Sequence, residues 1–124
     1  MRILLPAAIA IAALSAPGSA RDHNEIPVAT PDGKPQSCVP IMSLRESLVR
    51  SDSVIDFHIS GDRYYRVTLP QSCSGLGSER RFAYSTSLSQ LCSTDIITVL
   101  YQSPPMRGAS CGLGQFQPVK IAKR

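Results

Sequence analysis

Four cysteines constrain the fold of this 124-residue chain more than any other feature of its sequence. They are Cys38, Cys73, Cys92 and Cys111. An even number of cysteines in a small exported domain is typical of a disulfide framework, and the chain has no C-x-x-C pair and no Cys/His spacing that suits zinc. We therefore expect two disulfides. Three pairings are open, and the nested one, Cys73 with Cys92 and Cys38 with Cys111, is preferred; the loop-entropy model gives about 3 and 4 kcal/mol for these two bridges.

The first twenty residues, 1–20, have the pattern of a secretory signal peptide. Met1-Arg2 is a short basic start, and the apolar run from Ile3 to Leu14 is too short to cross a bilayer. Gly18-Ser19-Ala20 offers the small residues that a signal peptidase reads. We predict cleavage after Ala20, which places a mature chain without a transmembrane span in the periplasm or outside the cell. That compartment is oxidising, as two disulfides require.

The positive charge of the chain is mild. The formal net charge is +4, and the Lys and Arg residues are scattered along the sequence. Strong nucleic-acid binders concentrate basic residues and place aromatic residues among them, so the composition argues against a nucleic-acid partner. An excess of positive charge favours anionic neighbours. We expect the partner to be an envelope protein or an anionic component of the cell envelope.

The mature chain divides into a leader and one domain. Residues 21–37 contain three prolines and an Asp-Gly pair with little apolar content, which predicts a flexible leader. Residues 38–124 form a single β domain in this interpretation. Inside it, the segment Leu44 to Val49 is ambiguous. Ser43 and Glu46 fit a helix capping box, but Leu44, Glu46 and Leu48 also alternate with Arg45 and Ser47, as in a strand.

Alternating apolar residues from Ile55 to Leu69 predict a β-hairpin that turns at Ser60-Gly61-Asp62. A two-residue loop would place apolar residues on both faces, whereas a three-residue loop leaves one face apolar and is preferred. The preferred register pairs Phe57 with Tyr65, Ile55 with Val67, Asp56 with Arg66 and His58 with Tyr64. Asp56 and Arg66 would then form an outer-face ion pair that contributes a few tenths of a kcal/mol up to about 1 kcal/mol.

Further short strands complete an all-β domain. Asp95 to Tyr101 is apolar on both faces, as in a central strand, and Phe116 to Ile121 has the pattern of a closing strand. Together with the hairpin, these segments predict about five antiparallel strands. We expect a small partly open barrel or a curled antiparallel sheet, held by the disulfides.

The order of these features resembles a family of small exported proteobacterial proteins of unknown function. The pattern is a signal peptide, two cysteines around the hairpin, then Leu-Cys-x-x-Asp-x-Ile and Cys-x-Leu-Gly-x-Phe. The matching positions are Cys38, Asp56, Tyr65, Leu69, Cys73, Leu91, Cys92, Asp95, Ile97, Cys111, Leu113, Gly114 and Phe116. The resemblance covers about Cys38 to Val119. It implies periplasmic or secreted placement and a strand at Leu44 to Val49, and it brings no catalytic residues.

A metal chelate could form at the predicted mature N-terminus, Arg21-Asp22-His23. The free amine, two backbone amides and the His23 imidazole would supply four nitrogens in a plane, the geometry that Cu(II) and Ni(II) prefer. A histidine also falls at the third position by chance in about 2% of proteins, as expected from its average frequency. The chelate is therefore the alternative hypothesis, and no other cofactor is expected.

Other candidate functional residues lie in and after the hairpin. His58, with Asp56 two residues earlier on the same strand face, could serve a minor hydrolase, although no G-x-S-x-G nucleophile setting accompanies them. A possible binding surface contains Tyr64, Arg66, Arg80 and Arg81. Because no catalytic constellation is present, we expect a non-enzymatic periplasmic binding or accessory module.

Overall fold

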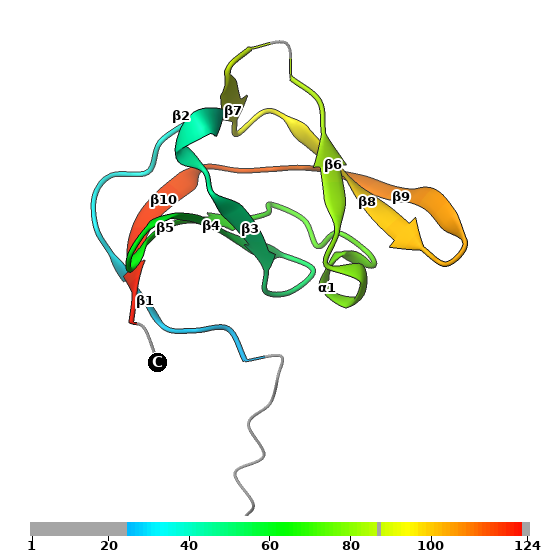
Figure 1. The fold of residues 1–124 in the computed structure, drawn as a ribbon, viewed down its shortest axis with the longest axis horizontal. Helices are drawn as coiled ribbons and strands as arrows, with labels where there is room; N and C mark the ends of the chain where they lie inside the picture. Colours follow the sequence, from blue (N-terminus) through cyan, green and yellow to red (C-terminus); the bar gives the residue numbers. More distant parts are fainter. Residues whose placement is uncertain (1–24, 87, 123–124) are drawn as a thin grey trace, which may run out of the picture.

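The computed structural model describes residues 25–86 and 88–122, and in this part of the chain almost all regular structure is β. Ten strands, one 3-10 turn and one short α-helix are present within these residues (Figure 1). In chain order they are β1 (Ala29–Pro31), β2 (Cys38–Pro40), η1 (Ile41–Ser43), β3 (Glu46–Val49), β4 (Val54–Ser60), β5 (Arg63–Thr68), α1 (Leu76–Glu79), β6 (Phe82–Tyr84), β7 (Gln90–Cys92), β8 (Ile96–Gln102), β9 (Pro105–Gly112) and β10 (Phe116–Ile121). The predicted all-β class is confirmed.

The strands form three antiparallel sheets that do not close into a barrel. The largest has five strands in the order β1-β10-β5-β4-β3. The sequence predicted about five strands in the whole domain, whereas the described residues form ten. A two-stranded sheet pairs β2 with β7, and a three-stranded sheet has the order β6-β8-β9. In Figure 1 the β8-β9 hairpin extends to one side of the molecule, while the β2-β7 pair lies near the top. The sequence pattern did not predict that these strands form two further, separate sheets.

The register of the β4-β5 hairpin is confirmed. Phe57 faces Tyr65, and Ile55 faces Val67, so the apolar side chains share one face. The preferred three-residue loop is wrong, because Ser60 pairs with Arg63 and the turn contains only Gly61-Asp62. A register shift between His58 and Ser60 takes up the extra residue and keeps the predicted pairs. Gly61 has a φ of 54°, a conformation that glycine adopts without steric cost.

The core lies between the five-stranded sheet and the two smaller ones. Phe57 contacts both Phe82 from the three-stranded sheet and Phe116 from β10, with ring centroids 6.3 and 5.9 Å apart. Val39 and Leu91 bring the β2-β7 pair into the same core, and both are fully buried. All three sheets therefore share one hydrophobic core, which makes residues far apart in sequence interdependent.

The ambiguous segment near Leu44 is a strand, as the family resemblance implied. Residues Ile41–Ser43 form a 3-10 turn, and β3 begins at Glu46. β3 pairs with β4, so that Val49 faces Ile55 and is buried. The Ser43 hydroxyl donates to the carbonyl oxygen of Pro40 at 2.7 Å, so it does not cap a helix.

The predicted boundary between leader and domain is wrong, because the five-stranded sheet includes residues that precede Cys38. β1 pairs with β10 along its whole length, placing Ala29 opposite Ile121. Gln36 forms a further bridge with Phe116. Every described residue from β1 onward therefore belongs with the domain, and the signal peptide predicted at residues 1–20 lies outside the described residues.

Two disulfides are present, but the preferred nested pairing is wrong. Cys38 is bonded to Cys92, and Cys73 is bonded to Cys111, so the two bridges interleave along the chain. The first joins opposite positions of β2 and β7. The second joins the loop before α1 to β9. Two disulfides indicate an oxidising compartment.

The helical content of the described residues is limited to short turns. None of these helices has the length and apolar character needed to cross a membrane.

Candidate functional site

The outer face of the three-stranded sheet is the best candidate for a binding surface. Along β8, Ile97 and Val99 are fully buried, so the alternating residues between and beside them point to the opposite face. Ile96 lies on that face with 57% of its surface exposed. Thr98 follows on the same face, and its hydroxyl lies 2.9 Å from that of Ser110 on β9. One side of this sheet is therefore core and the other meets solvent.

Pairing with β8 determines which neighbouring residues share this outer face. Residues directly opposite each other in an antiparallel pair point to the same side. Ala83 on β6 faces Thr98, and Arg107 on β9 faces Leu100. The backbone amide of Leu100 also donates to the carbonyl oxygen of Arg81 at 3.0 Å, which places Arg81 at the same end of the sheet.

Two hollows lie on this part of the molecule and share Arg107. The first, of about 400 Å³, is lined by Ala83, Tyr84, Ser85, Thr94, Asp95, Ile96, Thr98 and Arg107. The second, of about 430 Å³, is lined by Arg81, Leu100, Tyr101, Gln102, Pro105, Met106 and Arg107. Both are open depressions in the surface and not enclosed cavities. Because Arg107 lines both hollows, we treat them together and call them the outer-face site.

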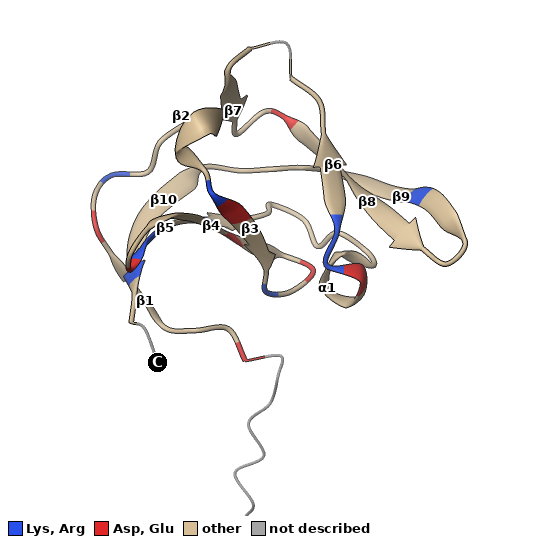
Figure 2. Cartoon of the chain, viewed as in Figure 1, with Lys and Arg blue, Asp and Glu red and all other residues tan. Residues whose placement is uncertain are grey.

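The outer-face site combines positive charge with exposed apolar side chains. Arg81 and Arg107 are exposed, and neither forms an ion pair with a described residue. Figure 2 shows basic positions at the start of β6 and on β9. The exposed apolar side chain on this face is Ile96, and Leu100 follows it there. Met106 and Tyr84 also line the hollows, but they lie opposite Tyr101 and Ile97 and so point toward the other face of the sheet. Such a surface suits a ligand that is both anionic and partly apolar.

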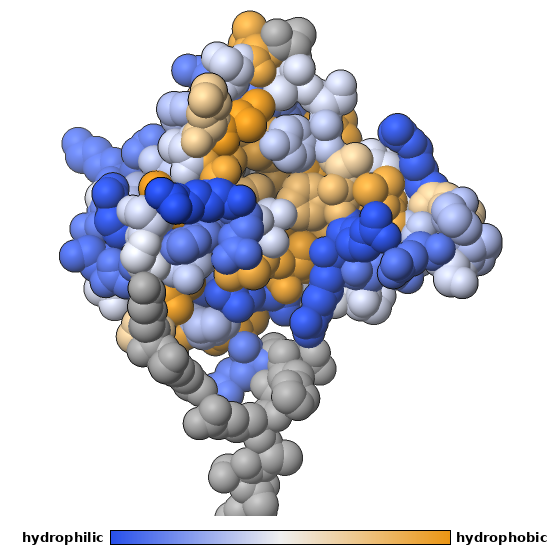
Figure 3. Space-filling view, viewed as in Figure 1, coloured by the Kyte–Doolittle hydropathy of each residue, from blue (hydrophilic) through white to orange (hydrophobic). Residues whose placement is uncertain are grey.

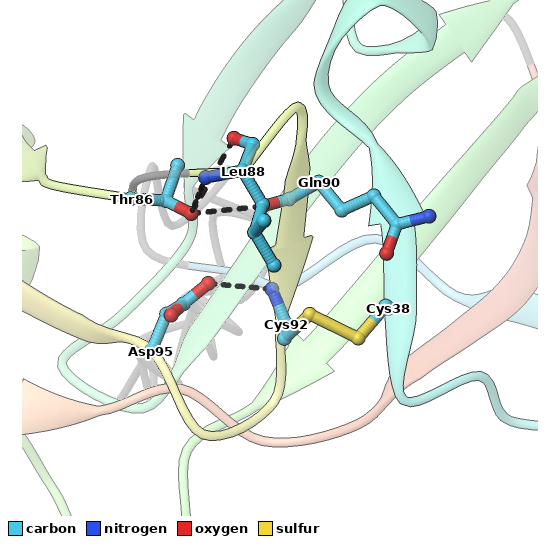
Figure 4. The surroundings of a disulfide bond; sticks show 6 residues. All are labelled: Cys38, Thr86, Leu88, Gln90, Cys92 and Asp95. Atoms are coloured by element: carbon cyan, nitrogen blue, oxygen red, sulfur yellow. Dashed lines mark hydrogen bonds between the residues drawn. A yellow bond between two sulfur atoms is a disulfide. The ribbon is translucent and has the colours of Figure 1, made fainter.

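One carboxylate lies in the outer-face site, and it already has a structural partner. Asp95 Oδ2 accepts a hydrogen bond from the backbone amide of Cys92 at 2.7 Å (Figure 4). This bond closes the turn between β7 and β8, and the carbonyl oxygen of Asp95 also accepts from Leu113 N at 3.0 Å. Asp95 therefore orders the strand entry, and the second hollow has no acidic residue in its lining.

Apolar surface also extends beyond the two hollows. Figure 3 shows apolar residues gathered between β3 and β6, with more near β7. Met42 is 95% exposed and Leu88 is 66% exposed. The two residues belong to neighbouring segments, because Ile41 N donates to the carbonyl oxygen of Ser89 at 3.0 Å.

The surface predicted from Tyr64, Arg66, Arg80 and Arg81 is not brought together as one site. Tyr64 and Arg66 lie on β5 in the five-stranded sheet, whereas Arg80 and Arg81 precede β6 in the three-stranded sheet. Arg66 is held by Asp56, and Tyr64 stacks on His58 with ring centroids 4.7 Å apart. Of the four, Arg81 is the one that lines the outer-face site.

The outer-face ion pair predicted between Asp56 and Arg66 exists, but its setting differs from the expectation. Asp56 is fully buried, so the pair is not a surface contact. Both of its oxygens accept hydrogen bonds from Arg66, and Arg50 Nε donates to Oδ2 at 2.8 Å. The N-terminal segment contributes to this network, because Arg66 Nη2 also donates to the carbonyl oxygen of Pro27 at 2.8 Å.

His58 is not positioned by Asp56 as a catalytic base would be. Its Nε2 lies 3.0 Å from the carbonyl oxygen of Gly61, and its Nδ1 lies 3.8 Å from Glu46 Oε1. The Asp56 carboxylate is occupied by the two arginines instead. His58 therefore supports the hairpin turn and the stack on Tyr64.

The N-terminal chelate hypothesis concerns residues that the structure does not describe. His23 lies before residue 25, so the Cu(II) or Ni(II) site stays a prediction. Among the described residues, no cluster of three His, Cys, Asp or Glu side chains could hold a metal ion.

Sequence reasoning missed Arg107 and Met106, because they follow the adjacent prolines Pro104 and Pro105, which are typical of a loop. The structure continues β8 into β9 there, with β9 beginning at Pro105. The sequence signal for this site was the presence of apolar residues on both faces of β8, because a strand face that only meets solvent is usually polar.

Comparison of the chain with known protein families, with curated proteins and with solved structures finds no match.

Proposed function

We propose that this protein is an exported, non-enzymatic binding or accessory module of the periplasm or the extracellular space. Its outer-face site contacts an anionic, partly apolar component of the cell envelope. The two disulfides support export, since such bridges persist outside the reducing cytosol. The pattern of residues 1–20 supports the same placement.

The observation that carries this proposal is the pair of adjoining hollows that share Arg107. Their walls provide apolar surface from Ile96 and Leu100 on the outer face. Arg81 and Arg107 provide positive charge, and neither forms an ion pair with a described residue. Apolar surface would contribute binding free energy, and the guanidinium groups would select an anionic head group by charge and hydrogen bonding.

The contacts of Asp56 and His58 also support a binding role over hydrolysis. These two side chains were the acid and base that the sequence suggested for a hydrolase. Asp56 instead bonds Arg50 and Arg66, and His58 bonds the hairpin turn. Both residues are thus accounted for by structural contacts.

Vesicle binding tests the proposal with a matched charge control. The oxidised protein is sedimented with vesicles of phosphatidylglycerol or of phosphatidylcholine. We expect binding to the anionic vesicles alone. Arg81→Glu/Arg107→Glu should weaken it at least about tenfold, since each basic residue near an anionic membrane contributes about 1 kcal/mol.

The control is Arg45→Glu/Arg63→Glu, which changes the net charge equally but alters exposed residues outside the outer-face site. It should retain most of the binding. Equal loss in both double variants would show that only net charge matters and would contradict the assignment to this face. Absence of binding to either vesicle would remove an anionic lipid surface as the ligand.

A further inference from the structure

The two disulfides differ sharply in their surroundings. Cys73 is fully buried in the hydrophobic core, and its partner Cys111 is partly exposed and packs against that core. Cys38 is exposed, and Cys92 is partly exposed. Attack on a disulfide requires that a thiolate reach one of the sulfurs. Cys38 is the one exposed residue among the four cysteines, so the bridge that contains it is the more accessible of the two.

Strand alternation explains why the Cys38–Cys92 bridge faces outward. In the β2-β7 pair, Val39 lies opposite Leu91, and both side chains are fully buried in the core. Neighbouring residues in a strand point to opposite faces. Cys38 and Cys92, which are also directly opposite each other, must therefore lie on the outer face of this pair (Figure 4).

The β2-β7 pair has contacts that do not depend on the disulfide. Ser93 N donates to the carbonyl oxygen of Ser37 at 2.7 Å, on one side of the bridge. At the other end, Ile41 N donates to Ser89 O at 3.0 Å. With Val39 and Leu91 packed in the core, these bonds can hold the two strands together while the bridge is open.

We propose that Cys38–Cys92 is a thiol-exchange site at which a small-molecule thiol forms a mixed disulfide with Cys38, while Cys73–Cys111 stays closed. The external thiolate attacks Cys38 Sγ, a new sulfur–sulfur bond forms, and the Cys38–Cys92 bond breaks. The electron pair leaves on Cys92 Sγ, which takes a proton from water. The external sulfur is oxidised and that of Cys92 is reduced, so the step is balanced. A second thiol molecule can then displace the first, releasing a small-molecule disulfide and leaving Cys38 as a thiol.

This site is separate from the proposed function, although it is close to the outer-face site. The backbone amide of Cys92 bonds Asp95, which lines the first hollow. Exchange at Cys38 can be measured without any ligand, so the two proposals succeed or fail independently.

Timed exchange with reduced glutathione tests the proposal on the wild-type oxidised protein. Samples are quenched with acid, free thiols are alkylated, and the four cysteines are mapped by peptide mass spectrometry. We expect the glutathione adduct on Cys38 and the alkyl group on Cys92. Both should appear at least about tenfold faster than any modification of Cys73 or Cys111, because access limits exchange.

Circular dichroism of the modified protein should still show the native β spectrum. Opening of both bridges at one rate would mean that exchange runs through global unfolding and would overturn the proposal, as would earlier modification of Cys73. An adduct mainly on Cys92 would overturn the choice of attacked sulfur. The variant Cys38→Ser/Cys92→Ser is the control and should resist glutathione; its rapid modification would likewise count against the proposal.

Discussion

Arg66 on β5 donates two hydrogen bonds to the buried carboxylate of Asp56 on the neighbouring strand β4. Nε donates to Oδ1 at 2.8 Å, and Nη2 donates to Oδ2 at 3.0 Å. Arg50, which follows β3, adds a third bond to the same carboxylate at 2.8 Å. Because Arg66 Nη2 also holds the carbonyl oxygen of Pro27, one carboxylate links two strands, a turn and the N-terminal segment.

Replacing the carboxylate should destabilise the protein strongly. In Asp56→Asn the side chain keeps its size but loses its negative charge. The positive charges of Arg50 and Arg66 are then left without a counterion. Their side chains are only 22% and 18% exposed, which limits compensation by water. We expect a loss of about 3 kcal/mol in the free energy of unfolding, measured by urea denaturation.

Asp62→Asn is the matched control for this substitution. Asp62 is exposed in the β4-β5 turn, and it forms no ion pair among the described residues. Its replacement should change stability by less than about 0.5 kcal/mol, as is usual for surface positions. Similar midpoints for the two variants would mean that the buried network contributes little.

Arg66→Lys should loosen the N-terminal segment as well as the hairpin. Lysine keeps the positive charge but cannot present two parallel N–H groups to the carboxylate, nor reach Pro27 in the same way. We expect a stability loss of about 2 kcal/mol, the size of a hydrogen bond to a charged group. Hydrogen exchange at the amides of β1 should accelerate more than exchange in β8.

The corresponding change at the neighbouring exposed residue, Arg63→Lys, should leave β1 exchange at the wild-type rate. If Arg66→Lys slows or preserves exchange in β1, the bond from Arg66 to Pro27 does not hold the segment.

The hairpin register could be predicted because it depends on local pattern. A shift of one residue would move Ile55, Phe57 and Val67 from the core to the opposite face, so alternation alone selects one register. The strand at Leu44 to Val49 was harder, since a short segment carries too few residues to distinguish the two periods.

The disulfide pairing and the burial of Asp56 could not be predicted in the same way. Both depend on contacts between segments distant in sequence: Cys38 and Cys92 are 54 residues apart, and Pro27 lies 39 residues from Arg66. Prolines before Cys38 suggested a flexible leader, yet proline is compatible with an edge strand such as β1. Asp56 is fully buried, its carboxylate is bonded by Arg50 and Arg66, and Arg66 in turn bonds Pro27 from the segment before β1.

The outer-face site was only partly predictable for a related reason. Arg81 was proposed as a binding residue on charge alone, which does not reveal its neighbours. Arg107 joins it because β9 folds back along β8 and places Arg107 opposite Leu100. The turn that joins these strands contains Pro104, and the prolines around it favoured a loop interpretation for the whole segment.

Full reduction of the protein should unfold it. The bridges close loops with sequence separations of 54 and 38 residues, and the loop-entropy model gives about 4 kcal/mol for each. Their sum is comparable with the net stability of a typical small domain. We expect loss of the β spectrum in circular dichroism after complete reduction under non-denaturing conditions. A fully alkylated protein with a native spectrum would mean that the core is sufficient without either bridge.

Gly114 should be the least replaceable glycine next to the closing strand. Its φ is 145°, and a Cβ built there would lie 2.8 Å from the backbone oxygen of Thr68, which cannot move as a flexible side chain could. Gly114→Ala should therefore cost about 2 kcal/mol through backbone strain and steric overlap, measured by urea denaturation. Gly112 provides the matched control, because a Cβ there meets no atom within 4 Å. Gly112→Ala should be close to neutral, and equal losses at the two positions would show that neither the Thr68 contact nor the φ of Gly114 determines the cost.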